Sequence, residues 1–241
     1  MKSLKLQADH PAIVNSGTVY PATVYPIEHY EFNVIKPSKN KKLGKLVTKG
    51  RYKGMPIYTV TLPERKTCPD SCSFWSSCYG NRMPYAHRID PTNDPDLFID
   101  TIKHEVSYLA YKHRHTGFLV RLHVLGDFFS LKYLQMWWHL QTKSFPNVLK
   151  VFGFSARLPQ KSRKRPHTIG DELLHIQKQR NKDFFIRFSG LIKDDVWSAN
   201  SINESEEGII CPYQLGLTEN CGTCGLCWTT DKPILWLNCE D

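Results

Sequence analysis

The chain has 241 residues, of which 41% are hydrophobic, and its 32 Lys and Arg against 23 Asp and Glu give a net charge of +9. This length suits one domain, or one domain with a small appendage, and the apolar fraction predicts a globular protein with a buried core. No stretch approaches the roughly 20 apolar residues of a membrane span, and MKSLKLQADH at the N-terminus lacks the apolar segment of a signal peptide. We therefore expect a cytoplasmic protein with no membrane partner. In that reducing compartment, clustered cysteines favour metal ligation or catalysis over disulfides.

The first 54 residues predict an arm followed by a basic loop. Residues 1–35 show little periodicity, and we expect an extended segment with one short strand at Tyr30–Ile35. Residues 36–53 then hold eight basic residues and no acid, and a second basic run lies at 160–167. Such runs can bind nucleic acid, because neutralised phosphates release counterions. A solvated, flexible surface is the alternative, but two runs in one chain favour a nucleic-acid partner.

Strands and helices alternate between residues 55 and 195. The patterns predict strands at 55–63, 118–125, 149–155 and 183–189, and helices at 93–113, 130–142 and 168–180. This alternation is typical of parallel βαβ units, and the near-continuous apolar strands predict a sheet covered on both faces. A closed eight-stranded barrel takes about 250 residues. We therefore expect an α/β fold with an open or partial (β/α) barrel at 55–195, an N-terminal arm at 1–54 and a cysteine-rich metal-binding tail at 196–241.

Three cysteines follow the first predicted strand. Cys68, Cys72 and Cys78 are spaced C-x3-C-x5-C, which is one ligand short of a closed structural metal site. Three thiolates would hold three irons of a [4Fe–4S] cluster and leave the fourth iron open to a cofactor or substrate. The alternative is a structural Cys3His zinc site completed by His87.

The tail carries a second cysteine group. Cys221, Cys224 and Cys227 are spaced C-x2-C-x2-C, with Cys211 and its following proline upstream. This pattern is close to ferredoxin-type iron–sulfur ligation, although there the remote cysteine lies downstream. Four cysteines also suit a tetrahedral zinc ion. We expect a metal of one of these kinds in the tail, whereas Cys239 has no assigned role.

Polar residues stand at the carboxyl ends of the predicted strands, where the sites of parallel sheets and barrels gather. They are Gly126, Asp127, Ser155, Arg157 and Ser189. Each has an ordinary explanation: an Asp after a strand is often a cap or turn residue, and glycine often forms turns. As a set beside a cysteine loop, they predict a site with a carboxylate, a guanidinium and hydroxyls around one opening.

These motifs resemble a known family. The segments LPERKTCPDSCSFWSSCYG, VRLHVLGDFFS, FGFSAR, IRFSG and the spaced cysteines ending in CW are similar to the bacteriophage and mobile-element family called gene product eighty-eight. That resemblance covers roughly residues 55–230 and implies a viral or mobile-element origin, hence a host cytoplasm, but no reaction.

The layout also resembles, more distantly, the radical S-adenosylmethionine enzymes, which carry a three-cysteine loop after the first strand of a partial barrel. This resemblance implies that Gly126 and Asp127 meet the methionyl amine and that Ser155, Arg157 and Ser189 complete the cofactor site. The x5 gap departs from that superfamily's usual x2 gap, and Tyr79 follows the third cysteine instead of preceding it.

The sequence as a whole predicts an iron–sulfur enzyme of radical S-adenosylmethionine type that modifies a nucleic acid or its precursor. Its cofactors would be [4Fe–4S] clusters and S-adenosylmethionine, with zinc as the alternative metal. One alternative function is a barrel-type transglycosylase that exchanges DNA bases, with Asp127 as nucleophile or base and structural metal sites. Another is a zinc-stabilised nucleic-acid-binding protein without enzymatic activity.

Overall fold

The structure is a computed structural model and describes residues 4–160, 166–190, 197–201 and 207–237. The second basic run lies mostly outside these residues, and so does Cys239. Within the described residues, no helix is long and apolar enough to cross a membrane.

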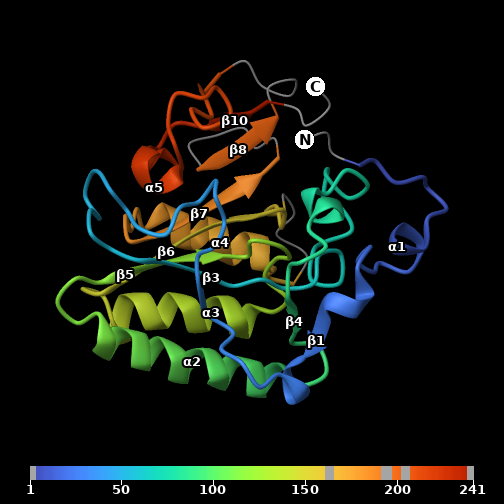
Figure 1. Cartoon of the computed structure of the whole chain (residues 1–241), viewed down its shortest axis with the longest axis horizontal. Helices are drawn as coiled ribbons and strands as arrows, with labels where there is room; N and C mark the ends of the chain where they lie inside the picture. The colour runs from blue at the N-terminus through green and yellow to red at the C-terminus, as the bar shows by residue number, and fades with distance from the viewer. Residues whose placement is uncertain (1–3, 161–165, 191–196, 202–206, 238–241) are drawn as a thin grey trace.

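A mostly parallel sheet of eight strands forms the centre of the molecule (Figure 1). Its strand order is β2-β3-β5-β6-β7-β8-β10-β9, and only β2 is antiparallel to its neighbour. The strands are β2 Lys36–Pro37, β3 Ile57–Thr59, β5 Phe118–Leu122, β6 Leu149–Ser155, β7 Phe184–Ser189, β8 Ser198–Ser201, β9 Ile209–Ile210 and β10 Ile234–Trp236. The mixed α/β class is thus confirmed. The pairing shows an open sheet, and a partial barrel remains a proposal.

A capping side chain fixes the start of each of the three long helices. Asp94 accepts a hydrogen bond from the backbone N–H of Leu97 and caps α2 (Pro95–Lys112), and Ser130 caps α3 (Leu131–His139) in the same way. Thr168 and Asp171 form a reciprocal capping box at the start of α4 (Ile169–Lys178). A π-helical turn, η4 (Leu140–Ser144), extends α3. These helices, and the strands from β5 to β7, confirm the predicted alternation.

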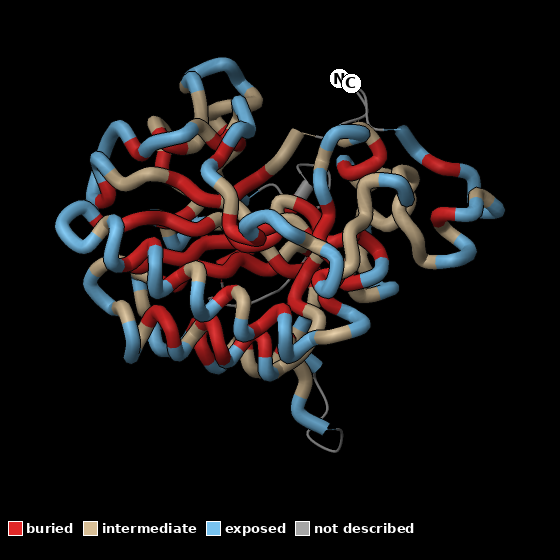
Figure 2. Tube along the Cα trace, turned by 60° about the horizontal axis from the view of Figure 1, so that its bottom comes forward, coloured by how far each residue is buried: buried red, intermediate tan, exposed pale blue. Residues whose placement is uncertain are grey.

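All three long helices cover the same face of the sheet. Alternate residues of β5 (Phe118, Val120 and Leu122) pack with buried residues of α2, α3 and α4 in one large core. Figure 2 shows this core as a red band along the strands. The strands β3, β5, β6 and β7 are adjacent in the sheet in the same order as along the chain. Right-handed crossovers between sequential neighbours place every connecting helix on one side.

The opposite face of the sheet, here named the inner face, is covered by the basic loop and the tail. Leu119, Phe152 and Phe185 of three adjacent strands pack with Val47 of the loop and Trp228 of the tail. The ring centroids of Phe152 and Trp228 lie 4.5 Å apart. The expectation of a sheet covered on both faces is therefore correct, although among the described residues no helix from a βαβ unit contributes to this second core.

The N-terminal segment differs from the predicted arm. It forms short elements instead of an extended chain: α1 Pro11–Val14, η1 Pro21–Thr23, β1 Val24–Pro26 and η2 Ile27–His29. The predicted strand at Tyr30–Ile35 is wrong, because the backbone N–H groups of Val34 and Ile35 donate to the Glu105 carboxylate of α2 instead of to a strand. Another small parallel pair joins β1 to β4 (Arg88–Asp90).

The tail is fixed to the sheet by one buried arginine. Arg187 of β7 is 0% exposed, and its guanidinium donates to the backbone carbonyls of Cys227 (3.0 Å), Lys232 (3.0 Å) and Thr230 in the tail. The tail elements are α5 (Cys221–Cys224) and η5 (Leu226–Trp228). A buried guanidinium needs several acceptors, so this residue specifies where the second cysteine group lies.

Candidate functional site

The first cysteine group lies in a loop that follows β3 at the carboxyl end of the sheet. Cys68, Cys72 and Cys78 are half-buried free thiols, and their sulfurs accept backbone N–H groups of Arg65, Phe74 and Gly80, respectively. Burial raises the pKa of all three thiols, to about 11 for Cys78, and these hydrogen bonds partly oppose the shift. A metal that bound them would therefore displace protons.

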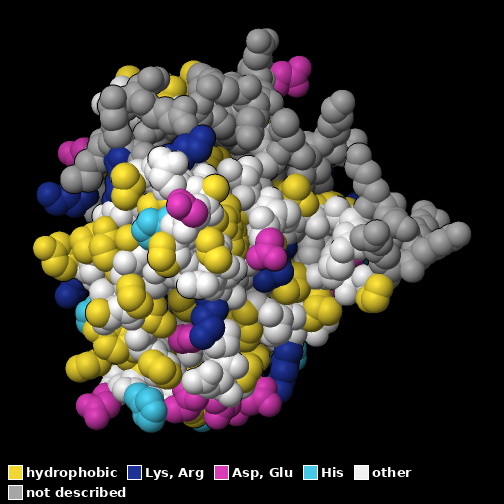
Figure 3. Space-filling model, turned by 90° about the vertical axis from the view of Figure 1, so that its right-hand side faces the viewer, with side chains coloured by type: hydrophobic (Ala, Val, Ile, Leu, Met, Phe, Trp, Pro, Cys, Tyr) yellow, Lys and Arg dark blue, Asp and Glu magenta, His cyan; other side chains and the backbone are white. Residues whose placement is uncertain are grey.

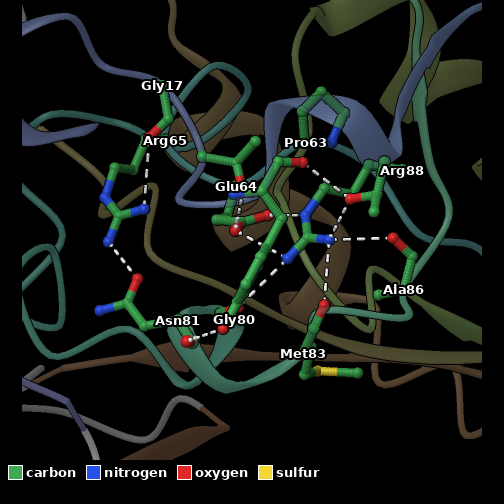
Figure 4. Close-up of polar contacts among 12 residues, drawn as sticks. Gly17, Pro63, Glu64, Arg65, Gly80, Asn81, Met83, Ala86 and Arg88 are labelled. Atoms are coloured by element: carbon green, nitrogen blue, oxygen red, sulfur yellow. Dashed lines mark hydrogen bonds and ion pairs between the residues drawn. The ribbon is translucent and has the colours of Figure 1, made fainter. Parts of the chain in front are cut away.

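A buried ion pair joins the two ends of this loop (Figure 4). The Arg88 guanidinium donates Nε–H to Glu64 Oε2 at 2.7 Å and Nη2–H to Oε1 at 3.0 Å. Both side chains are at most 1% exposed. Arg88 also donates to the carbonyls of Gly80, Met83 and Ala86, the three residues that lead from the loop to β4. The pair is bidentate and surrounded by further partners, as a buried pair must be to offset desolvation.

A second polar pair holds the middle of the loop. Arg65 donates from Nη2 to Asn81 Oδ1 at 2.5 Å and from Nε to the carbonyl of Trp75 at 3.2 Å. The Asn81 amide donates in turn to the carbonyls of Ser76 and Leu4. Arg65 and Asn81 are both buried. The backbone between the second and third cysteines is therefore fixed by hydrogen bonds to side chains that flank it.

Gly126 brings the end of β5 against the same loop. It has φ +81°, and a Cβ at this position would lie 2.6 Å from both Leu62 Cβ and Thr67 Oγ1. Any other residue would therefore be strained and would collide with the segment before Cys68. The close approach lets the Asp127 N–H donate to Thr67 Oγ1 at 3.1 Å.

The Asp127 carboxylate connects the ends of β5 and β6. Its Oδ1 accepts the Ser155 hydroxyl at 2.8 Å, and its Oδ2 accepts the Ala156 N–H at 2.7 Å. Arg157 closes the group, because its Nη2 donates to the Thr67 carbonyl at 2.8 Å and its Nε donates to the Phe128 carbonyl. The structure thus brings together four of the predicted residues, Gly126, Asp127, Ser155 and Arg157. Ser189, at the end of β7, is half-buried and is not part of this network in the described contacts.

The carboxylate is electrostatically coupled to the cysteine loop. Burial raises the pKa of Asp127 to about 6, against the opposing effects of Arg157 and of hydrogen bonds from Ser155 and the backbone. Asp127 is also the second cause, after burial, of the raised pKa of Cys68. A positive group placed between them would stabilise both anionic forms.

His87 does not complete a Cys3His group. Its side chain is exposed, and its ring packs against Tyr25 at a centroid distance of 5.0 Å. Across the residues that the structure describes, no three His, Cys, Asp or Glu side chains are arranged so that they could hold a metal ion. The three thiols of the cysteine loop are nevertheless soft donors of the kind that iron–sulfur clusters and zinc both take.

The tail brings its cysteines around one cavity. Cys211, Cys221, Cys224 and Cys227 all line it, together with Tyr213 and Leu226. Burial raises the pKa of Cys221 to about 12 and that of Cys227 to about 11, and Arg187 opposes the second shift. Four thiols around one cavity are the donor set of a tetrahedral thiolate site, although they are not a metal-holding group as they stand.

Two arginines on the strands were not predicted from the sequence to have a role. Arg121 of β5 and Arg187 of β7 point to the same face as Leu119 and Phe185, toward the tail. In FLVRL and FFIRF, a single basic residue interrupts an otherwise apolar strand. Since a charge at such a position is costly unless it has a partner, this interruption was the signal that could have identified them.

The chain is thus an α/β protein with two groups of thiols. One group lies in the loop at the carboxyl edge of the open, mostly parallel sheet, and the other lies in the tail on its inner face. The family model described as Gene product 88 matches residues 33–150. The match supports the resemblance to that phage gene-product family over the basic loop, the first cysteine group and Asp127, and it ends before Ser155 and the tail. No curated protein and no solved structure matches the chain.

Removing the buried guanidinium of Arg88 should destabilise the protein and expose the loop. Arg88→Met leaves the Glu64 carboxylate buried without its cation, and we expect a loss of about 3–5 kcal/mol in the free energy of unfolding. Urea denaturation measures this loss, and the rate of thiol modification by Ellman's reagent measures loop opening. Lys103→Met, which breaks an exposed pair with Asp100, is the control. A loss below about 1 kcal/mol with unchanged thiol reactivity would show that the ion pair does not hold the loop.

The Asp127 carboxyl should make stability fall as pH rises from about 4 to about 6. The pKa of this carboxyl is raised to about 6 in the folded protein, so as the pH rises the carboxyl loses its proton in the unfolded chain before it does so in the folded one. The stability that the protonated carboxyl provides below its unfolded pKa is therefore lost between the two pKa values. The loss is on the order of 2–3 kcal/mol. Asp127→Asn cannot titrate, and its unfolding free energy should lack this fall in urea titrations at each pH. Asp96→Asn on the exposed surface is the control; if the Asp127→Asn and wild-type curves run parallel, the buried carboxyl does not titrate in this range.

Proposed function

We propose that the chain is an iron–sulfur enzyme of radical S-adenosylmethionine type that modifies a nucleic acid or its precursor. One observation carries the proposal: the three-cysteine loop after β3 is tied to the ends of the next two parallel strands through Thr67, Asp127 and Arg157. The sequential order of β3, β5, β6 and β7, with every long helix on one face, supports the barrel-like arrangement that such an enzyme uses.

In this proposal, Cys68, Cys72 and Cys78 hold a [4Fe–4S] cluster through three irons. Such a cluster, with S-adenosylmethionine at its open iron, supplies one-electron reductive cleavage of the cofactor. Asp127 would attract the methionyl ammonium through its charge and not by direct contact, because its carboxylate is 2% exposed and already accepts three hydrogen bonds. Arg157 and Ser155 would hold the strand ends in place, and Arg157 would also face a carboxylate or phosphate in the cavity of about 430 Å³ that it lines with Pro69, Ser71 and His167.

The tail would hold a second metal centre through Cys211, Cys221, Cys224 and Cys227. Its role would be electron transfer or structure, and zinc is the alternative to iron and sulfide. The buried Arg187 favours an anionic centre next to it. Its described hydrogen bonds all go to backbone carbonyls and its other described contact is the Phe185 ring, so a thiolate site would offset its positive charge.

The geometry disfavours the transglycosylase alternative. Asp127 is 2% exposed, and its two oxygens accept three hydrogen bonds from Phe128, Ser155 and Ala156. A nucleophile must reach the reacting carbon, and a base must reach the proton that it takes. This carboxylate would have to leave its partners to do either.

Anaerobically reconstituted protein should contain iron and acid-labile sulfide and, once reduced, should convert S-adenosylmethionine to 5′-deoxyadenosine. Cys78→Ala should abolish this product, because the first cluster loses a ligand. Cys224→Ala is the matched control and should leave the first cluster countable. Chromatography measures the product, and iron and sulfide analysis counts the clusters. Iron-loaded protein that makes no 5′-deoxyadenosine contradicts the proposal, and colourless protein with zinc and no sulfide supports the zinc-stabilised binding protein instead.

The basic run provides the proposed contact with nucleic acid. The structure shows an ordered loop: Leu43, Val47 and Tyr52 are buried, while the side chains of Lys39, Lys41, Lys45, Lys49 and Lys53 are exposed. Within the described residues, Arg51 is the one member of this run that forms an ion pair with an acid, Asp183. A row of lysines on a fixed backbone without acidic partners suits phosphate contacts.

Replacing Lys39, Lys41, Lys42 and Lys45 by Ala should flatten the salt dependence of nucleic-acid binding. Each lost phosphate contact removes about 0.7–0.9 from the slope of log K against log salt concentration. Fluorescence anisotropy with a labelled oligonucleotide measures the slope, and metal content should not change. Lys103→Ala with Lys112→Ala on the exposed side of α2 is the control. If the slope is unchanged, the run is solvated surface only.

A further inference from the structure

Near its carboxyl edge, the inner face of the sheet is less completely buried than the helix-covered face. On the covered face, Phe118, Val120 and Leu122 are completely buried. On the inner face, Phe154 of β6 and Trp236 of β10 are only half-buried, although both are large apolar side chains. Both rings pack against the buried Ala199, Cys211 and Ile234 and keep part of their surface accessible. Large aromatic rings that are partly accessible are common in binding surfaces.

These rings form a continuous group that reaches the cysteine loop. The ring centroids of Phe154 and Trp236 lie 5.1 Å apart, and that of Phe74 lies 6.3 Å from Trp236. Phe74 stands between Cys72 and Cys78 and is also half-buried. Figure 3, which faces the side of the molecule where the strands end, shows hydrophobic side chains at the surface among scattered charges. The aromatic group therefore lies next to the proposed cluster.

Arg121 adds a positive charge to this group. Its guanidinium lies 4.5 Å from the ring centroid of Phe154 and 5.5 Å from that of Phe152. In the described part of the chain, Arg121 forms no ion pair with an acid, and its hydrogen bond to a described partner goes to the backbone carbonyl of Leu122. A guanidinium has five N–H donors, and this described hydrogen bond uses one of them. Burial lowers the pKa of Arg121, and Tyr79, Cys227 and Cys221 oppose that shift.

We propose that Arg121, Phe74, Phe154 and Trp236 bind one nucleotide unit of the substrate, with the base against the aromatic rings and the phosphate against Arg121. This inference rests on the proposed function and names the substrate's binding site. An uncharged apolar ligand would leave Arg121 without an anion, and a simple anion would leave the rings exposed. A nucleotide supplies a partner for the rings and an anion for Arg121, because every base has a stacking face and a guanidinium pairs well with phosphate.

Binding to the full-length chain tests the site without S-adenosylmethionine or reductant. Fluorescence polarisation with a labelled single-stranded decamer gives Kd, and competition with unlabelled nucleoside monophosphates separates a free nucleotide from a nucleic-acid strand as the source. Arg121→Met should weaken binding about tenfold or more, and Trp236→Leu by about five- to a hundredfold. Trp236→Phe keeps a ring and should bind within about threefold of wild type, which guards against misfolding of the Leu variant.

A cation–π pair of the same kind elsewhere supplies the control. Arg114 lies 5.1 Å from the ring of Tyr111 at the exposed end of α2, so Arg114→Met and Tyr111→Leu should not change Kd. Unchanged affinity in both Arg121→Met and Trp236→Leu would overturn the inference. If 5′-deoxyadenosine forms but these variants bind normally, only this site is wrong; if they lose binding while no 5′-deoxyadenosine forms, only the radical chemistry is wrong.

Discussion

The ion pair between Glu64 and Arg88 is the contact on which the candidate site depends. The segment between these residues contains three cysteines and little regular structure, so neither a ladder of strand hydrogen bonds nor a helix can hold it. Its shape comes from side chains that accept or donate to its backbone, chiefly Arg88, Arg65 and Asn81. Burying a full charge pair is costly in itself. Here the pair fixes the positions of both ends of the loop. A ligand bound by all three thiols would require these fixed positions.

The site next to the loop is positioned by the same kind of interaction. Asp127 and Arg157 reach from the ends of β5 and β6 to Thr67, just before the first cysteine. The absence of a Cβ at Gly126 permits this approach. Three consecutive parallel strands are thus tied together at their carboxyl ends by polar contacts, while their middles are held by the core beneath the helices. Rigid strands with polar cross-links at one edge are suited to holding reactive groups in fixed positions.

Much of this arrangement could be predicted from sequence, and the reasons for the exceptions are physical. The periodicity of the apolar residues located the helices, because this signal is local, and in the structure Asp94, Ser130 and Thr168 cap their first turns. The contact of Asp127 with Ser155 could be predicted as well, since the carboxyl ends of parallel strands lie at the same edge of a sheet. The Glu64–Arg88 pair was not, because ordinary charged residues in a loop give no sign that they are buried together. The packing of the basic loop against the tail was equally hidden, because it joins segments about 180 residues apart.

The interlocking of the basic loop and the tail has a consequence for biosynthesis. Backbone N–H groups of Cys221 and Gly222 donate to carbonyls of Lys42 and Leu43, and Trp228 fills the second core between them and the sheet. A chain made from its N-terminus therefore completes the basic loop and then β5, β6 and β7 before the tail, which supplies the rest of the cover for their inner face, is made. Until the tail is made, Leu119, Phe152 and Phe185 can be covered only by the basic loop, and exposed apolar surfaces are what chaperones bind and what drives aggregation. Synthesis of the last fifth of the chain thus completes the cover of the inner face and removes this apolar surface from chaperones.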